Sequence, residues 1–510
     1  MVLWAPLRRS QSQATSLAGD IRHNFLGMTM INSLRTSLQQ RGYMHLIGGD
    51  LQTSEECFDV FNPSTGKAFV QAPSASRAQF EQAVTAARSA FSGWSRTSYE
   101  KRRYYIGCLA DAMQSRLEEM ATLLTLEQGK PLAAARAEIE RGISIIRQLI
   151  SIVVKHEVMR DDNTGRVELR YKPLGVVGGI APWNVPIVLA APKIASALYT
   201  GNTMLLKPSP YTPLTTLLLG EIARDILPPG VLNVLAGGND LGQWMTEHPG
   251  IDKITFTGSI ATGKKVLAAS ASNMKRVTLE LGGNDAAIVL NDVAVRDIAA
   301  RLFQAAFANS GQVCQAIKRL YVQDGVYENL LDELVAIAKQ TKVGDGFEPG
   351  VNLGPVQNRA QYDRVLDILD DTARQTGVRI LVGGGAMDRP GYFVEPTIVA
   401  DIQEGTRLVD EEPFGPVLPV IRFFDVADVI CRANNTRFGL GGSVWTTDIQ
   451  QGADIADRLE AGVVWVNHHL GVSAEYPFGG VKESGLGRAN GLMGLLRNME
   501  PQLVVLPNDN

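Results

Sequence analysis

The stretch "FTGSIATGKKV", Phe256–Val266, joins an apolar strand to a helix through a glycine turn. The preceding residues place the strand at Lys253–Thr257, and the helical pattern continues to about Asn273. Gly258 and Ser259 form the turn. Because the first amides of a helix are unpaired and its N-terminus is partly positive, this junction is suited to binding a phosphate group. Ser259 is expected to cap the helix and to donate its hydroxyl to a pyrophosphate oxygen.

The same stretch is similar in spacing to the phosphate loop of nucleotide hydrolases. That loop needs Ser or Thr directly after its lysine, to hold magnesium through the hydroxyl. Here Lys265 follows Lys264 and cannot do so, which argues against a hydrolase. Taken alone, the stretch is also compatible with an ordinary capped helix, and Lys264 is expected to be an exposed helix residue.

Strand and helix patterns alternate on both sides of this stretch. "NTMLLKPS", "VLNVLAG" and "RVTLELGG" belong to one series, and "RLYVQ", "PTIVAD", "VLPVIRF", "GGSVWT" and "GVVWVN" belong to a second. This cadence is typical of parallel sheets with helices on both faces. We therefore predict an α/β fold with two doubly wound domains.

The segment Leu174–Pro192 has Asn184 as its one polar side chain. Its three prolines, Pro182, Pro186 and Pro192, would interrupt a membrane helix. We predict a buried strand followed by a loop. Ahead of it, "RVELRYKP" alternates like a ribbon with one face in solvent, and is a candidate interface element.

The composition favours a small-molecule partner. The chain has 510 residues, 45% of them hydrophobic, and a formal net charge of -4 from 49 basic and 53 acidic residues. No overall charge points to nucleic acid or to an anionic membrane surface. The four cysteines form no C-x-x-C pair and the six histidines form no H-E-x-x-H motif, so we predict no metal site and a reducing compartment.

Residues 1–42 differ from the rest of the chain. Their arginines, Arg8, Arg9, Arg22, Arg35 and Arg41, stand against a single acid, Asp20, with serines between them. This is typical of a mitochondrial transit peptide, and a disordered extension fits equally. A cytoplasmic protein is the first expectation and a mitochondrial one the alternative.

Several residues could carry chemistry. Glu280 lies in an apolar strand, where burial would raise its pKa and suit it to act as a general base, although a water-facing strand end is the simpler interpretation. Cys314 follows a Gly-Gln turn. If a helix follows the turn, the pKa of the Cys314 thiol would be lowered. Otherwise Cys314 is expected to be a buried apolar residue of the core. Asn184 could donate to an oxyanion, and Lys207 stands at the carboxyl end of a strand, where ligands bind in open sheets.

Together these segments resemble the aldehyde dehydrogenase superfamily. The matching stretches, from about Pro182 to Arg488, are "PWNVP", "GNTMLLKPS", "FTGSIATGKK", "LELGG", "NSGQVC", "EEPFGPV", "NNTRFGL", "GVVWVN" and "PFGGVKESGLGR". Weaker similarity extends back to Tyr43. Glu280 and Cys314 stand 34 positions apart in the sequence, as the family's base and nucleophile do.

The resemblance implies NAD(P)-dependent oxidation of an aldehyde to an acid. Cys314 would be the nucleophile, Asn184 an oxyanion donor and Glu280 the base that activates water. Lys193 would line the active-site side of the cofactor fold. The residues that would contact NAD, or NADP, are Pro182, Trp183, Lys207, Ser209, Gly258, Ser259, Gly282, Glu412 and Phe414.

Three positions depart from the family pattern: Pro210 replaces a glutamate that reads the adenosine ribose, Ala489 an acid, and Asn284 a lysine. The first leaves the choice between NAD and NADP open. Val313 and Gln315 beside the nucleophile supply no positive charge, which favours an uncharged aliphatic or aromatic aldehyde. The alternatives are a coenzyme A-dependent acylating enzyme, in which Glu280 would have no use, and a catalytically silent protein of the same fold.

The resemblance also implies a division of the chain. The expected parts are an extension at 1–42, a cofactor domain at 43–157 and 173–281, an oligomerisation ribbon at 158–172 and 495–510, a catalytic domain at 282–476, and a return segment at 477–494. Since the ribbon has free edges, a homodimer or homotetramer is expected.

Overall fold

The structure, a computed structural model, describes residues 31–471 and 473–507. These fall into two compact units, one ending at Gly42 and one beginning at Tyr43. In the first unit, residues 31–40 are helical. Most of the predicted transit peptide lies outside the described residues. Within the described ranges, no helix is long and apolar enough to cross a membrane.

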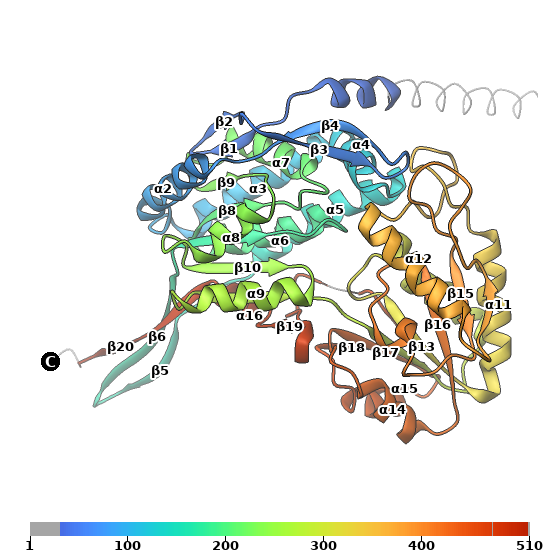
Figure 1. Ribbon diagram of the computed structural model, residues 1–510. Helices are drawn as coiled ribbons and strands as arrows, with labels where there is room; N and C mark the ends of the chain where they lie inside the picture. The colour runs from blue at the N-terminus through green and yellow to red at the C-terminus, as the bar shows by residue number, and fades with distance from the viewer. Residues whose placement is uncertain (1–30, 472, 508–510) are drawn as a thin grey trace, which may run out of the picture. The chain divides into compact units, whose positions relative to one another are not determined.

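The strand at the start of "FTGSIATGKKV" belongs to an eight-stranded sheet, seen with its helices at the upper left of Figure 1. The strand order is β19 (Gly485–Leu486), β11 (Arg276–Glu280), β10 (Lys253–Thr257), β7 (Val176–Ile180), β8 (Thr203–Lys207), β9 (Leu232–Val234), β1 (His45–Ile47) and β2 (Asp50–Gln52). The strands from β11 to β9 are parallel, as predicted. β19, β1 and β2 add antiparallel strands at the two edges, which the sequence analysis did not predict.

Helices cover both faces of this sheet. Ile254 and Phe256 of β10 pack in one core cluster with α2 (Arg77–Trp94), α8 (Asn239–Glu247) and α9 (Ile260–Ala271). Because side chains alternate along a strand, the intervening Thr255 and Thr257 point to the other face. There Lys193, from α6 (Pro186–Tyr199), donates hydrogen bonds to both threonines. The sheet is therefore doubly wound.

The remaining helices of this part are α3 (Tyr99–Ser115), α4 (Leu117–Gln128), α5 (Leu132–Ser151), α7 (Leu214–Arg224) and α16 (Gly491–Leu496). A separate hairpin joins β3 (Cys57–Asn62) and β4 (Lys67–Pro73).

The helix α6 corrects the prediction for Leu174–Pro192. β7 is the expected buried strand, but a helix and not a loop begins at Pro186. Proline is tolerated at the first helical position because its missing N–H would be unpaired there anyway. Pro192 lies inside the helix, at the cost of one backbone hydrogen bond.

A second sheet forms the other half of the second unit (Figure 1). Its order is β14 (Arg379–Val382), β15 (Thr397–Ala400), β16 (Val417–Phe423), β13 (Ile317–Gln323), β12 (Asp285–Val289), β17 (Gly441–Trp445) and β18 (Val463–Val466). α10 (Val295–Phe307) and α11 (Tyr327–Gln340) pack on one face. α12 (Arg359–Ala373), α14 (Val426–Asn434) and α15 (Ile449–Asp457) pack on the other. The short helix α13 (Arg407–Asp410) leads into β16. The predicted second doubly wound region is confirmed, with only β14 antiparallel.

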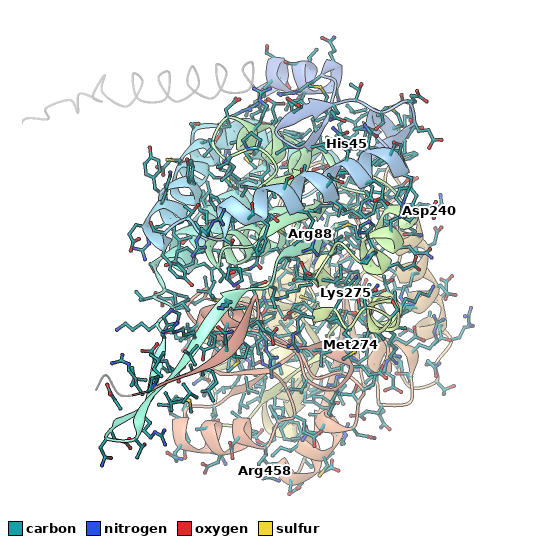
Figure 2. The ribbon with its side chains drawn as sticks, turned by 90° about the vertical axis from the view of Figure 1, so that its left-hand side faces the viewer. His45, Arg88, Asp240, Met274, Lys275 and Arg458 are labelled. Carbon is teal, nitrogen blue, oxygen red and sulfur yellow. The ribbon has the colours of Figure 1, made fainter. Side chains whose placement is uncertain are left out.

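A three-stranded antiparallel sheet extends away from the body in both views (Figures 1 and 2). β6 (Gly165–Pro173) pairs with β5 (Glu157–Asp162) on one side and with β20 (Met499–Leu506) on the other. All of β5 is exposed. The predicted ribbon therefore exists. The domain boundaries drawn around it stay a prediction.

Polar contacts close the amino ends of the central strands in the first sheet. Arg88 of α2 pairs with Asp252, just before β10, at 2.8 Å, and Lys275, just before β11, donates to the carbonyl of His248 at 2.7 Å. Arg88 and Lys275 are labelled in Figure 2. The opposite, carboxyl ends of these strands carry Lys207, Thr257 and Glu280. This is the edge where open α/β sheets bind ligands.

Candidate active site

Cys314 lies on a tight turn between a 3-10 segment (Ala308–Gly311) and β13. Asn309, Ser310 and Gly311 have successive positive φ angles of 52°, 57° and 73°. A Cβ atom on Gly311 would lie 2.0 Å from the carbonyl oxygen of Gly415, so only glycine fits there. This conformation turns the chain sharply just before the cysteine.

The expected lowering of the Cys314 pKa was wrong. A strand and not a helix follows the residue, so no helix N-terminus supports a thiolate. Burial raises the pKa of the thiol to about 12, and the nearby carboxylates of Glu412, Asp285 and Glu280 add to the rise. Lys318 opposes them. The side chain is half-buried and open to two cavities.

Glu280 ends β11 with a buried side chain, 7% exposed, so the water-facing interpretation was wrong. Neither carboxylate oxygen has a hydrogen-bond partner among the described residues. Burial raises the pKa of Glu280 to about 8, and the positive charges of Lys193 and Arg488 limit the rise. The raised pKa agrees with the prediction from its apolar neighbours. At neutral pH this carboxyl is largely protonated.

Asn184 is buried in the loop between β7 and α6. Its Nδ2 donates to the carbonyl of Gln312, two residues before the cysteine, at 2.8 Å. The backbone carbonyl of Asn184 accepts hydrogen bonds from Lys130 Nζ at 3.1 Å and Asn309 Nδ2 at 3.0 Å. An amide nitrogen has two hydrogens, and the second has no acceptor in the described part of the chain. Asn184 is thus held firmly with one donor to spare.

The first of the two cavities has a volume of about 620 Å³ and contains Cys314, Glu280 and Lys193 in its lining. The Lys193 ammonium donates to Thr257 at 2.8 Å and to Thr255 at 3.3 Å. Burial lowers the pKa of Lys193 to about 8, while Glu280 opposes that change. A second buried lysine, Lys253, lines the same cavity, and burial lowers its pKa to about 7.

The second cavity has a volume of about 520 Å³. It brings together nine of the predicted residues, namely Pro182, Trp183, Asn184, Gly258, Ser259, Gly282, Cys314, Glu412 and Phe414. Lys207 and Ser209 are not in its lining. Lys207 ends β8 nearby, where its ammonium donates to the carbonyl of Pro208 at 3.3 Å and burial lowers its pKa to about 8.

The turn of "FTGSIATGKKV" faces this second cavity. Ser259 caps α9, because its hydroxyl oxygen accepts a hydrogen bond from the amide of Thr262 at 3.2 Å. The amide of Gly258 donates to the carbonyl of Glu280 at 3.1 Å, which ties the turn to the end of β11. Lys264 is exposed and pairs with Glu483 at 2.7 Å. Its predicted exposure is confirmed, but Lys264 also lines the second cavity, so its separation from a phosphate stays a prediction.

Glu412 also lines the second cavity. One of its oxygens accepts from the amide of Gly283 at 3.2 Å, and burial raises its pKa while Lys318 opposes the rise. A Cβ atom on Gly282 would lie 2.3 Å from the other oxygen, so the carboxylate sits against bare backbone. Phe414 meets Trp183 edge-on, with ring centroids 5.4 Å apart. Two aromatic rings and a carboxylate therefore shape this end of the cavity.

Two features were missed from the sequence. Lys130 and Glu138 form a buried ion pair, and Glu138 also accepts from the amide of Ile187 at the start of α6. Lys318 is buried beneath Cys314. A lysine inside the apolar run "AIKRLYV" was a signal for the second, whereas the partner of Lys130 depends on the packing of α5 against α6.

Known proteins resemble the chain over almost its whole length. A sequence model described as aldehyde dehydrogenase family matches residues 51–504. A probable aldehyde dehydrogenase of Pseudomonas sp is 38% identical over 475 residues, covering 93% of this chain and 97% of that protein. Retinal dehydrogenase 2 of Homo sapiens is 37% identical over 471 residues, 90% of this chain and 91% of that protein.

Solved structures show the same relationship. Betaine aldehyde dehydrogenase from Staphylococcus aureus, in complex with NAD+, superposes with a TM-score of 0.90 at 30% identity, covering 94% of this chain and 98% of that one. An NAD+ complex of aldehyde dehydrogenase from Bacillus cereus gives a TM-score of 0.90 at 34% identity, covering 92% and 98%.

Proposed function

Because the chain belongs to the aldehyde dehydrogenase family and oxidises aldehydes in an NAD(P)-dependent reaction, we propose that Cys314, Glu280 and Asn184 carry the chemistry. One observation carries this assignment. Cys314 lies where the two cavities meet, with Glu280 in the first and Glu412 in the second. A group on the cysteine can therefore be reached from both sides.

The second cavity fits a nicotinamide dinucleotide. The N-terminus of α9, capped by Ser259, offers amide hydrogens to a pyrophosphate. Glu412 can accept hydrogen bonds from ribose hydroxyls, and Phe414 and Trp183 present apolar faces to a planar ring. When bound, the nicotinamide supplies the hydride acceptor.

Cys314 acts first. Its sulfur adds to the carbonyl carbon of the aldehyde, and the carbonyl oxygen becomes an oxyanion. The spare hydrogen of the Asn184 amide and the backbone amide of Cys314 stabilise this oxygen. The adduct loses its hydrogen as hydride, and a thioester forms on Cys314.

Glu280 acts second. In its ionised form it takes a proton from a water molecule, whose oxygen attacks the thioester carbon; the carbon–sulfur bond breaks, the acid is released, and the leaving sulfur takes up the proton to restore the thiol. The Glu280 carboxyl lines the same cavity as Cys314. Its oxygens have no partner in the described structure and are free to orient water. Such a base has no role in transfer to coenzyme A, so the acylating reaction is not favoured.

The first cavity favours an uncharged apolar aldehyde. The apolar side chains in its wall include Ala134, Ile145, Val188, Pro192, Leu353 and Leu470. Phe478 is the one aromatic residue among its described lining residues, which disfavours a quaternary ammonium substrate, since such cations bind in aromatic cages. Lys130 is neutralised by Glu138. An aliphatic or simple aromatic aldehyde fits this wall best.

One observation favours a second substrate class. Arg141 of α5 is exposed and lines the same cavity. Its charge would attract an aldehyde that carries a carboxylate at its far end. A panel of aliphatic, aromatic and carboxylate-bearing aldehydes, each with NAD and with NADP, separates the two classes. We expect NAD to serve and NADP to be tolerated, because Pro210 offers no carboxylate to repel a 2'-phosphate.

The test of the catalytic assignment is Cys314→Ala. We expect this variant to bind NAD as wild type does, measured by calorimetry, and to reduce none of it with any aldehyde of the panel. Turnover of the variant at the wild-type rate would exclude Cys314 as the nucleophile. Loss of cofactor binding together with turnover would point to a structural role instead.

We further propose that the chain divides into a cofactor domain (43–157 and 173–281), a catalytic domain (282–476), a return segment to the cofactor domain (477–494) and an oligomerisation ribbon (158–172 and 495–510). The compartment is proposed to be the cytoplasm, with the mitochondrion as the alternative. Fusing residues 1–42 to a fluorescent reporter tests it: diffuse signal supports the cytoplasm, and signal in mitochondria overturns it.

A further inference from the structure

Lys318 occupies an unusual position directly behind the nucleophile. It lies on β13, one strand residue past the turn, and is only 2% exposed. Its ammonium donates to the carbonyl oxygen of Cys314 at 2.6 Å and to that of Val313 at 2.8 Å. It also pairs with Glu412 Oε1 at 3.2 Å. An ammonium has three hydrogens, so these contacts use all of them.

A buried lysine costs free energy unless its charge is matched. Here the charge of Lys318 is compensated by the backbone carbonyls of Val313 and Cys314 and by the carboxylate of Glu412 in the second cavity. The ammonium also stands 5.8 Å from the ring centroid of Phe414. The Lys318 side chain therefore links the cysteine turn to Glu412 and Phe414, which line the second cavity.

The charges around the Cys314 thiol are mostly negative. Burial is the main cause of its raised pKa; Glu412, Asp285 and Glu280 add to the rise when they are ionised, and Lys318 is the basic group that acts to lower it. His469 contributes no positive charge, because burial lowers its pKa to about 3. Its Nε2 bonds to the carbonyl of Gln315 at 2.8 Å.

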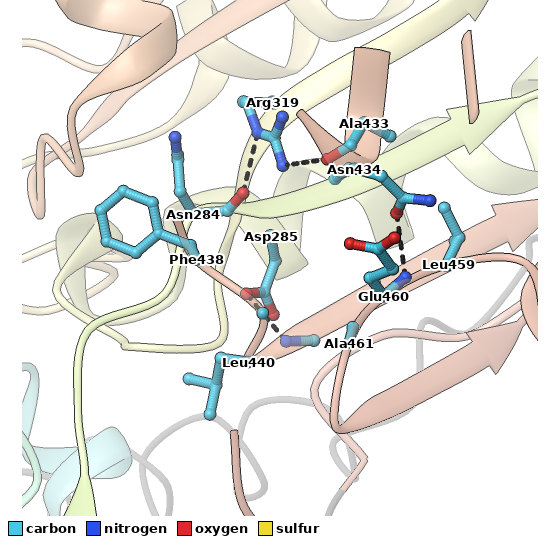
Figure 3. A pocket seen from close by; sticks show the side chains of 14 residues that line it. Asn284, Asp285, Arg319, Ala433, Asn434, Phe438, Leu440, Leu459, Glu460 and Ala461 are labelled. Atoms are coloured by element: carbon cyan, nitrogen blue, oxygen red, sulfur yellow. Dashed lines mark hydrogen bonds between the residues drawn. The ribbon is translucent and has the colours of Figure 1, made fainter. Parts of the chain in front are cut away.

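The neighbouring Arg319 is a useful contrast. It is also buried, but side chains alternate along a strand, so it points to the other side of β13. Figure 3 shows it reaching the carbonyls of Asn284 and Ala433, at 2.9 and 3.0 Å, on the wall of a separate small cavity. Asp285 borders that cavity too and accepts from the amide of Gly441 at 3.0 Å. The two adjacent cations thus serve different sites.

We propose that Lys318 is a positioning residue for the reaction: it fixes the Cys314 backbone, supports the thiolate by its charge, and ties both to the cofactor-binding carboxylate Glu412. This inference rests on the proposed roles of Cys314 and Glu412. It predicts that one substitution weakens both thiol reactivity and cofactor binding, although Lys318 lines neither cavity.

The test is alkylation of Cys314 by iodoacetamide in the full-length enzyme, without cofactor or aldehyde, followed by peptide mass spectrometry between pH 6 and 10. Only the thiolate reacts, so the rate at a fixed pH reports the thiolate fraction. A charge a few ångströms away shifts a pKa by about one unit or more, and one unit is a factor of ten. We expect Lys318→Met to alkylate at least about tenfold more slowly than wild type at each pH, and to bind NAD more weakly.

Two further variants make the result decisive. Lys318→Gln keeps hydrogen-bond donors but removes the charge, and it should also slow alkylation; it carries the test if Lys318→Met does not fold. Arg319→Met removes the adjacent buried cation and should leave the alkylation rate near wild type. Alkylation of Lys318→Gln at the wild-type rate, or equal slowing by Arg319→Met, would overturn the proposal. Alkylation needs no turnover, so a wild-type enzyme that oxidised no aldehyde would refute the proposed function and not this result.

Discussion

Glu280 is held in an environment that opposes its own ionisation. It ends a strand, has no partner for either oxygen in the described structure, and faces Lys193 and Arg488 at longer range. The apolar neighbours Val277, Leu279 and Leu281 indicated a raised pKa, but the sequence also allowed a water-facing strand end, and the charges of Lys193 and Arg488 could not be predicted from this strand. A carboxyl with a pKa near 8 is a stronger base than an ordinary glutamate once it is ionised.

The raised pKa predicts the pH dependence of turnover. Below about pH 8 Glu280 is mostly protonated and cannot activate water, and above it the carboxylate is present. We expect steady-state turnover to rise with pH from 6.5 to 9 with a midpoint near that pKa, wherever hydrolysis of the thioester limits the rate. Stopped-flow measurement of the initial burst and the later steady rate checks this. A steady rate that is flat over the same range would contradict it.

The same burial predicts a stability effect. The pKa of Glu280 is higher in the folded protein than its ordinary value of 4.5, so the folded state binds the proton more tightly. Stability from this group is therefore full below about pH 4.5 and is lost as the pH rises through 8. Glu280→Gln removes the titration. We expect the free energy of unfolding of the variant to exceed that of wild type at pH 9 by on the order of a few kcal/mol, and by less at pH 5. Equal differences at both pH values, measured by calorimetry, would exclude the effect.

The thiol shows where local sequence stops being informative. "NSGQVCQAIKR" gives a turn, but neither the strand that follows nor the carboxylates from β12 and from the loop before β16 can be read from it. Those residues, Asp285 and Glu412, are far from Cys314 in sequence and meet it only when the second sheet forms. Burial raises the pKa of Cys314, and these carboxylates add to the rise, so the lowered pKa expected for a turn leading into a helix does not occur.

At the level of single elements, the strand–turn–helix unit β10–α9 combines two functions in one residue. Ser259 stabilises the helix start and also lines the second cavity. The sequence could predict both, since a Ser after a strand and before a helical pattern is a typical N-cap. The antiparallel edge strands β1, β2 and β19 could not be predicted in this way, because two or three residues are too short to show a period.

Ser259→Ala separates the two functions. Loss of the cap should cost about 1 kcal/mol of stability, and loss of the hydroxyl should also weaken NAD binding. Ser76→Ala is the matched control: Ser76 caps α2 through the amide of Gln79 at the same 3.2 Å, and it lines neither of the two active-site cavities. Calorimetry should show similar destabilisation in both variants and weaker NAD binding in Ser259→Ala alone. Equal NAD affinity in the two would remove Ser259 from the phosphate site.

In the molecule as a whole, the ribbon formed by β5, β6 and β20 is the part whose open strand edges and exposed apolar side chains indicate a binding partner. β5 and β20 are its edge strands, and both leave backbone groups open to pairing. Large apolar side chains on it are exposed, among them Met159 at 63% and Val505 at 64%. The alternating pattern of β6 predicted the ribbon. Its partner in β20 lies more than 300 positions away in sequence and could be assigned only through the family resemblance.

The exposed ribbon predicts self-association. We expect a homodimer or homotetramer in sedimentation experiments, and a smaller species when Val505→Lys and Met159→Lys are combined. Phe424→Lys is the control, because Phe424 is 72% exposed and lies outside the ribbon. A wild-type monomer, or an unchanged assembly in the double variant, would contradict a role for the ribbon in assembly.

The proposed reaction passes through a thioester on Cys314 that Glu280 then hydrolyses. The most direct measurement is intact and peptide mass spectrometry of Glu280→Gln after mixing with NAD and an aldehyde. We expect one equivalent of reduced cofactor per active site, followed by a stall, with the acyl group of the substrate attached to the peptide that contains Cys314. Steady turnover at the wild-type rate with no acyl adduct on that peptide would contradict it.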